Sequence, residues 1–142
     1  MKGGYNKLFL VLLYKYNIMR EIKTNDAPKA IGPYSQAVEI NGFLFASGQL
    51  PANPETGNIE GDIVKQAEQS CKNVEAILKA NGMDFSNVVK TTCFLANIED
   101  FAKFNEVYSK YFTGEIKPAR SCVAVKDIPK GALCEIEIIA SK

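Results

Sequence analysis

The sequence predicts an α+β domain in which a single sheet carries two helices on one face. Only two segments show the helical periodicity of apolar side chains, whereas five others show strand-like alternation or short apolar runs. In chain order these segments read β-β-α-β-α-β-β. The chain has 142 residues, which is long enough for one such domain with its own core.

The first two strands are predicted as a hairpin. Residues 36–40 and 43–50 are β-rich runs, and Asn41 and Gly42 separate them. An Asn-Gly pair between two such runs is a strong hairpin signal, because both turn positions need a positive φ. Residues 51–58 contain two prolines and a glycine, which predicts an exposed loop.

The clearest helix is predicted over residues 62–80, where apolar side chains form one stripe and charged ones lie opposite. Gly82 follows at a position suited to end the helix. The apolar stripe consists of Ile63, Ala67, Cys71, Val74, Ile77 and Leu78. Such a helix packs one face on a sheet and exposes the other to solvent.

Residues 88–96 alternate as a strand, and residues 98–112 form the second predicted helix. The aromatic stripe of that helix is predicted to lie in the core rather than against a cofactor. It comprises Phe101, Phe104, Tyr108, Tyr111 and Phe112. Residues 120–125 and 133–140 are two further strands, and a turn-rich segment separates them.

The last predicted strand indicates that the chain self-associates. Its side chains alternate between two faces, and neither face is purely polar. One face holds Cys134, Ile136, Ile138 and Ala140, and the other holds Glu135, Glu137 and Ile139. With two helices on one side, the second face of the sheet is bare. We expect another chain to cover it, because large apolar surfaces are rarely left exposed.

Residues 1–18 differ in character from the rest. They carry three lysines, no acidic residue and a short apolar run that is too short to span a membrane. No small-residue cleavage site of a signal peptide follows this run. We expect an N-terminal extension of a domain that comprises residues 19–142. A targeting or membrane-surface role and an ordered added element stay open as alternatives.

Composition excludes several classes of function. The net charge is +1 for the chain and −2 without the three lysines of residues 1–18, which is poorly suited to nucleic acid. The absence of histidine excludes Ser-His-Asp and Cys-His catalysis and His-ligated zinc. Neither a phosphate-binding glycine loop nor a metal-binding cysteine cluster occurs. The four cysteines, at positions 71, 93, 122 and 134, formally allow two disulfides. However, Cys71 is predicted on the apolar face of a helix and the others in strands, which favours reduced, buried thiols in a cytoplasmic protein.

A few polar residues lie in apolar or turn contexts. Arg120 precedes a hydrophobic strand, and Glu135 is expected on a neighbouring strand. This pair is either a structural ion pair or an anion site with a carboxylate that activates water. Tyr34 lies in a Gly-Pro turn, where it either projects into a cleft or packs structurally. Gly48 within a strand marks a bulge or a close backbone approach.

Several motifs together resemble the RidA family of reactive-intermediate deaminases, also called YjgF-like or L-PSP. They are IGPYSQA, FASGQLPANPETG, KNVEAILKANG, VVKTTCFLANIEDFAKFNEVYSKYF, PARSCVAV and CEIEIIA. The resemblance extends from about Arg20 to Ser141 without large gaps, and residues 1–18 lie outside it.

The resemblance implies a chorismate-mutase-like fold that assembles as a homotrimer, with the sheets as an inner barrel and the helices outside. The active sites would lie at the subunit interfaces. The implied activity is hydrolysis of small enamine and imine acids, such as 2-aminoacrylate and 2-iminopropanoate, to a 2-keto acid and ammonia. No cofactor, metal, nucleic acid or membrane is implied.

The resemblance also assigns site residues one by one. Arg120 corresponds to the arginine that binds the substrate carboxylate, Glu135 to the acidic residue that activates water, and Tyr34 to the pocket tyrosine. Glu137 points to the same side of its strand and is the alternative to Glu135 if the register differs by one pair. The substrate-binding positions are Ser47, Gly48, Asn105 and Cys122.

Three functions are compatible with these residues. The first is an imine deaminase, and the second is a regulatory trimer that binds 2-keto acids in the same pocket without turnover. The third is the family's older label of ribonuclease or translation inhibitor, against which the charge argues. Glu135 favours catalysis, because binding an anion does not require a neighbouring carboxylate.

Overall fold

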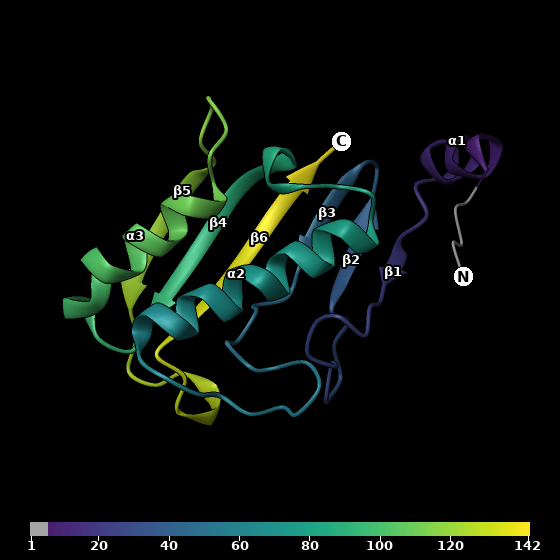
Figure 1. Ribbon diagram of the computed structural model, residues 1–142. Coiled ribbons are helices and arrows are strands. Elements are labelled where there is room, and N and C mark those ends of the chain that lie inside the picture. Colours follow the sequence, from purple (N-terminus) through teal and green to yellow (C-terminus); the bar gives the residue numbers. More distant parts are fainter. Residues whose placement is uncertain (1–5) are drawn as a thin grey trace.

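The computed structural model describes residues 6–142, and a six-stranded mixed sheet forms its centre (Figure 1). The spatial order of the strands is β1-β2-β3-β6-β4-β5, and only the β4–β5 pair is parallel. The strands are β1 (Arg20–Ile22), β2 (Ala37–Ile40), β3 (Phe43–Ala46), β4 (Val88–Leu95), β5 (Ala119–Ala124) and β6 (Cys134–Ser141). Helices α2 (Ile63–Ala80) and α3 (Phe101–Tyr111) lie on the same face of this sheet. The predicted α+β class is therefore confirmed.

The predicted hairpin is formed by β2 and β3. Asn41 and Gly42 have φ values of 52° and 80°, as their turn positions require. Ile40 pairs directly with Phe43 across the turn. The residue types of this turn thus set the register of the hairpin.

The second strand of the hairpin ends earlier than predicted, at Ala46. The backbone leaves the regular ladder at Ser47 and Gly48 and contacts β6 again at Gln49. There the Gln49 N–H donates to the carbonyl of Ile136 at 2.7 Å. The interruption matches the sequence expectation that Gly48 marks an irregular backbone position.

Helix α2 begins after a polar capping residue, and α3 begins after a short 3₁₀ turn. Asp62 caps α2, because its side chain accepts a hydrogen bond from the Lys65 N–H at 3.1 Å. Gly82 has a φ of 66° just beyond the end of α2, where only glycine adopts that angle without strain. α3 begins at Phe101, later than predicted, because residues 98–100 form a 3₁₀ turn.

The aromatic stripe of α3 is buried for most of its length. Phe104 and Phe112 lie in the core, and Tyr108 and Tyr111 pack against it while partly exposed. The prediction is wrong for Phe101, which is 37% exposed. Phe101 stands on the first turn of the helix, where the stripe has passed beyond the core.

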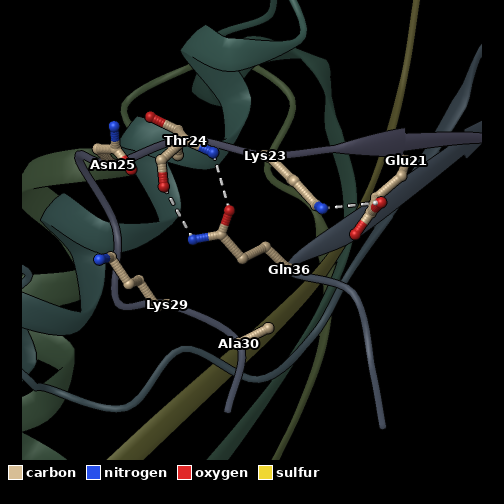
Figure 2. A pocket seen from close by; sticks show the side chains of 7 residues that line it. All are labelled: Glu21, Lys23, Thr24, Asn25, Lys29, Ala30 and Gln36. Atoms are coloured by element: carbon tan, nitrogen blue, oxygen red, sulfur yellow. Dashed lines mark hydrogen bonds and ion pairs between the residues drawn. The ribbon is translucent and has the colours of Figure 1, made fainter. Parts of the chain in front are cut away.

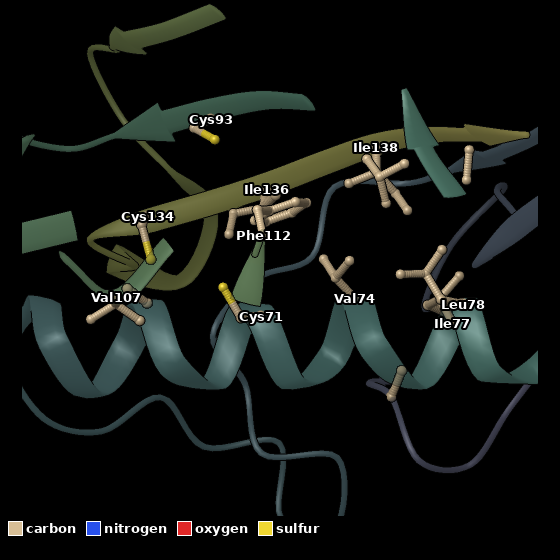
Figure 3. Packing of buried hydrophobic residues seen from close by; sticks show 14 of the residues in the cluster. Cys71, Val74, Ile77, Leu78, Cys93, Val107, Phe112, Cys134, Ile136 and Ile138 are labelled. Atoms are coloured by element: carbon tan, nitrogen blue, oxygen red, sulfur yellow. The ribbon is translucent and has the colours of Figure 1, made fainter. Parts of the chain in front are cut away.

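The core lies between the sheet and the two helices. β6 occupies the middle of the sheet, and Ile136 and Ile138 on its helix-facing side are fully buried. Cys71, Val74 and Ile77 of α2 point towards them (Figure 3). Each fully buried aliphatic side chain of this kind contributes about 1.5–3 kcal/mol to stability. The alternation predicted for the last strand is therefore confirmed.

All four cysteines are free thiols, as the sequence predicts. Cys71, Cys93 and Cys134 are buried in the core, whereas Cys122 is half-buried. Burial raises the pKa of Cys93 and of Cys134 to about 12, and it also raises the pKa of Cys71. The three buried thiols consequently stay protonated and pack as small hydrophobic side chains.

Within residues 6–142, no helix covers the other face of the sheet. Phe43 and Phe45 of β3 and Val123 of β5 point to this side, and each is 42–46% exposed. An apolar sheet face of this kind is normally buried by a further layer. The bare face expected from the sequence is thus present, and we call it the open face.

Two elements precede β2, of which β1 was not predicted and α1 corresponds to the open alternative of an ordered element within residues 1–18. β1 pairs with β2 at the edge of the sheet, and its Arg20 donates two hydrogen bonds to Glu39, from Nε at 3.1 Å and from Nη2 at 2.6 Å. Helix α1 (Lys7–Tyr16) belongs to the expected extension of residues 1–18, of which residues 1–5 lie outside the described part. No helix within the described residues has the length and apolar character needed to cross a membrane.

Candidate active site

An open cavity of about 670 Å³ extends from β6 to the loop before β2 and the segment after β3. Four residues of the predicted site line it, namely Tyr34, Ser47, Gly48 and Glu135. Glu137, the alternative to Glu135, lines the same cavity. We call this set the carboxylate half of the candidate site.

Glu135 lies directly over the backbone of Gly48. A Cβ atom at residue 48 would overlap with Oε1 of Glu135 and would lie 2.8 Å from its Cδ. Any side chain at this position would therefore displace the carboxylate. The glycine that follows β3 is what allows Glu135 to occupy this place in the cavity.

The surroundings of Glu135 favour its neutral form. Partial burial raises the pKa of this carboxyl above its usual range, and the negative charge of Glu137 raises it further. Because Glu135 and Glu137 are two residues apart on one strand, their side chains point to the same side of the sheet. A carboxylate with a raised pKa is a stronger proton acceptor once it is ionised.

Tyr34 and Ser47 connect the cavity to the loop before β2. Ser47 donates from its hydroxyl to the carbonyl of Ser35 at 2.6 Å, which ties the two segments together. The Tyr34 side chain is 54% exposed, and its hydroxyl accepts a hydrogen bond from the Ile31 N–H at 3.3 Å. The phenol is therefore a surface group at the cavity rather than a core tyrosine.

Arg120 lies on the other face of the sheet, beneath α3. Its Nη1 donates to Oδ1 of Asn105 at 2.6 Å. Its guanidinium carbon lies 4.7 Å from the centre of the Tyr108 ring and 5.6 Å from that of Phe101. Cys122 follows two residues later on the same side of β5, half-buried. We call Arg120, Asn105 and Cys122 the arginine half of the site.

The prediction of a structural ion pair between Arg120 and Glu135 is wrong. The sequence places the two residues on neighbouring strands, but β4 lies between β5 and β6. The register also puts them on opposite faces. Cys93 of β4 aligns with Cys122 and with Ile136, so these three side chains share one face. Arg120, two residues before Cys122, lies on that face, whereas Glu135, next to Ile136, lies on the other. Among the described residues Arg120 forms no ion pair.

The single chain thus brings the predicted site residues together in two groups rather than one. From the sequence, Tyr108 is predicted in the core stripe and Thr91 in a strand, and neither is predicted as a site residue, although both belong to the surroundings of Arg120. The helical spacing of Phe101, Asn105 and Tyr108 was a possible signal, because residues four and three apart share one face of a helix.

A smaller cavity of about 360 Å³ beside β1 contains none of the predicted site residues (Figure 2). The Gln36 amide at its base hydrogen-bonds with the backbone of Thr24 and with the carbonyl of Pro28. At its rim Lys23 pairs with Glu21 at 3.3 Å. These polar groups stabilise the path of the chain into β2, so the larger cavity is the candidate site.

Comparisons with known proteins agree with this architecture. Residues 24–142 match the family model described as Endoribonuclease L-PSP. A solved structure of the Rid family, YyfA from Yersinia pestis, superposes with a TM-score of 0.85 at 51% identity and covers 88% of this chain and 100% of that one. The crystal structure of E. coli TdcF with bound serine gives a TM-score of 0.83 at 43% identity, over 87% and 98% of the two chains.

Curated relatives carry different names. A putative regulator, AldR of Lactococcus lactis, is 57% identical over 123 residues, which are 86% of this chain and 97% of that protein. A mouse protein named 2-iminobutanoate/2-iminopropanoate deaminase is 48% identical over 124 residues, which are 87% and 91% of the two chains. The chain belongs to the RidA (YjgF-like, L-PSP) family.

Proposed function

We propose that this protein is an imine deaminase that hydrolyses 2-aminoacrylate and 2-iminopropanoate-type intermediates to a 2-keto acid and ammonia. The observation that carries the proposal is the carboxylate of Glu135, held over Gly48 in an open cavity with a raised pKa. A site that only bound an organic anion would gain nothing from a carboxylate there. The name of the mouse relative supports the same chemistry.

The proposed reaction needs one anion clamp and one proton acceptor. Arg120 binds the carboxylate of the imine through its planar guanidinium. Glu135 accepts a proton from a water molecule whose oxygen attacks the C=N carbon, and the electron pair of the C=N bond moves to nitrogen. Glu135 then returns the proton to nitrogen, which gives a carbinolamine. It next accepts the proton of the carbinolamine hydroxyl and passes it to nitrogen as the C–N bond breaks, so that ammonia leaves and the carbonyl of the keto acid forms. No step requires a cofactor.

Arg120 and Glu135 lie on opposite faces of the sheet, so a small substrate cannot contact both in one chain. We propose that the two halves meet across the interfaces of a homotrimer. Burial of Phe43, Phe45 and Val123 on the open face would supply the association energy, at about 25 cal/mol per Å² of apolar surface. The trimer would place active sites between subunits, as the family resemblance implies.

A second candidate is a regulator that binds 2-keto acids without turnover. The name of the Lactococcus lactis relative favours it, since that protein is called a putative regulator. Both candidates share the arginine clamp, so ligand binding does not distinguish them. Turnover distinguishes them, because only a deaminase needs Glu135 to accept a proton.

In the deciding experiment, a serine dehydratase in excess generates 2-iminopropanoate continuously. Because this step is then fast, the rate of pyruvate formation reports the hydrolysis of the imine. We expect the purified protein to accelerate keto-acid release in proportion to its concentration, and the Glu135→Gln variant to lack this effect. Keto-acid binding without acceleration would favour the regulator. Light scattering on the same sample should give three times the monomer mass, and a monomer would exclude the interface site.

A further inference from the structure

The aromatic ring of Tyr108 packs against the guanidinium of Arg120. The centre of its ring lies 4.7 Å from the guanidinium carbon, within the range of a cation–π contact. Its hydroxyl shares a hydrogen bond of 2.9 Å with Oγ1 of Thr91, which is fully buried. Thr91 is the register partner of Arg120 on the neighbouring strand β4. The side chain of Thr91 therefore anchors the Tyr108 ring next to the arginine that the ring contacts.

The core holds the same ring from its other side. Tyr108 stacks on Phe112, with ring centres 4.1 Å apart and planes inclined by 19°, and Phe112 is buried. Burial raises the pKa of Tyr108 to about 12, so the phenol stays protonated at ordinary pH and its bond to Thr91 persists. A continuous set of contacts thus runs from the core through Tyr108 to Arg120.

Asn105 determines which edge of the guanidinium is available. It stands one helical turn before Tyr108 and accepts a hydrogen bond from Nη1 of Arg120 at 2.6 Å. Among the described residues, Nε and Nη2 have no hydrogen-bond partner. These two donors form one edge of the guanidinium plane, and their spacing matches the two oxygens of a carboxylate.

We propose that Tyr108, anchored by Thr91, positions Arg120 so that its Nε–Nη2 edge receives the carboxylate of a 2-keto or 2-imino acid. The inference deepens the proposed function and rests on it for the class of ligand. Tyr108 is a positioning residue in this arrangement, because it acts through Arg120 and does not touch the ligand. Asn105 belongs to the same support, since it occupies the Nη1 end and leaves only one edge open.

The first test measures the Kd of 2-oxobutanoate by isothermal calorimetry, so that no turnover is needed. Tyr108→Leu removes the aromatic face, and we expect binding to weaken about tenfold. Tyr108→Phe keeps the face and loses only the bond to Thr91, so its Kd should stay within about threefold of the wild type. Tyr111→Phe is the matched control, because Tyr111 lies on the same helix and its ring packs on Phe85. We expect that variant to bind normally.

The second test uses Asn105→Asp, which keeps the size of the side chain and its contact with Arg120. The new carboxylate would form an ion pair with the guanidinium and compete with the ligand. We expect the melting temperature to be kept and keto-acid binding to weaken by tenfold or more. This variant answers the question even if Tyr108→Leu fails to fold.

The outcomes separate this inference from the proposed function. Where imine hydrolysis is measurable, Tyr108→Leu should raise KM while kcat changes little, because the carboxylate contact is made equally in the ground state and the transition state. A merely structural role would lower the melting temperature and leave Kd unchanged, and that result would overturn the inference. Binding that follows the expected order in a protein without deaminase activity would overturn the proposed function alone. A wild type that does not bind 2-oxobutanoate would overturn the inference.

Discussion

Glu135 and Arg120 lie on opposite faces of one sheet, and their surroundings hold a charged group in different ways. Glu135 depends on the backbone, because its place exists only where Gly48 leaves room. Arg120 depends on side chains, because Asn105 and Tyr108 of one helix contact it directly. The carboxylate half is therefore sensitive to added volume, and the arginine half is sensitive to the loss of particular groups.

The two halves also differ electrostatically. Burial and the charge of Glu137 make the ionised form of Glu135 unfavourable. The arginine half is arranged for a permanent charge, with an amide oxygen at 2.6 Å and an aromatic face at 4.7 Å. One half is suited to exchange a proton, and the other is suited to hold an anion.

The largest effect is expected for Glu135→Gln. The side chain keeps its size but cannot accept a proton, so kcat should fall by about 10²- to 10⁴-fold while the Kd of a keto acid stays nearly unchanged. Steady-state kinetics and calorimetry on the same sample measure both quantities. A fully active Glu135→Gln together with an inactive Glu137→Gln would assign the proton acceptor to Glu137.

The same variant has a stability consequence with a definite sign. A carboxyl group whose pKa is raised in the folded state stabilises the fold below its unfolded pKa and loses that contribution as the pH rises through the folded pKa. Near neutral pH the ionised Glu135 therefore destabilises the folded state, and replacement by glutamine removes this destabilisation. Glu135→Gln should melt at the same or a higher temperature than the wild type near pH 7, and the difference should shrink towards pH 4.

Arg120→Lys is expected to have the next largest effect. Lysine keeps the charge but loses the planar fork, so at least one hydrogen bond of about 1.5–3 kcal/mol and the orientation it imposes are lost. We expect kcat/KM to fall about ten- to several-hundred-fold with little change in melting temperature. An enzyme that remains fully active, or one that is inactive only because it is unfolded, would remove Arg120 from the site.

Mixed trimers test whether the two halves meet across an interface. Arg120→Lys and Glu135→Gln subunits, co-expressed with different affinity tags, would form some interfaces with one intact arginine and one intact carboxylate half. In random mixtures of equal amounts, roughly a quarter of the interfaces are intact, so about that share of wild-type activity should return. If both halves acted within one chain, no activity would return.

Gly48→Ala is expected to reduce turnover by displacing Glu135. The added methyl group overlaps with the carboxylate, which must rotate away from its place in the cavity. We expect kcat to fall by about tenfold or more while keto-acid binding persists. In the Glu135→Gln background the same change should cost far less, because neighbouring residues that act together are not additive. Equal losses in both backgrounds would show that Gly48 acts independently of Glu135.

The smallest effect is expected for Glu137→Gln. The charge of Glu137 raises the pKa of Glu135, so its removal should lower that pKa. The acid limb of the pH profile of kcat/KM should move to lower pH, with turnover near neutral pH changed by no more than about threefold. A profile that does not move would show that the two carboxyl groups are not coupled during catalysis.

The sequence alone determined the local structure where patterning and turn chemistry agree. Asn41-Gly42 set the hairpin, Asp62 and Gly82 delimit α2, and the alternation of β6 separates the core from the open face. β1 was not predicted, because its three residues are too few to show an alternating pattern. Phe101 continues the aromatic stripe in sequence yet leaves the core, since the extent of the sheet beneath α3 decides which turns are buried.

Only the tertiary structure decided how the site residues relate to one another. Motif resemblance named Arg120, Glu135 and Tyr34 and implied interface sites. The residues alone placed Arg120 and Glu135 on neighbouring strands, although β4 separates β5 from β6. Strand order depends on long-range pairing, which the alternation within each strand does not encode. The order of the strands sets the face on which each side chain lies, and it is therefore what divides the arginine and the carboxylate into two halves.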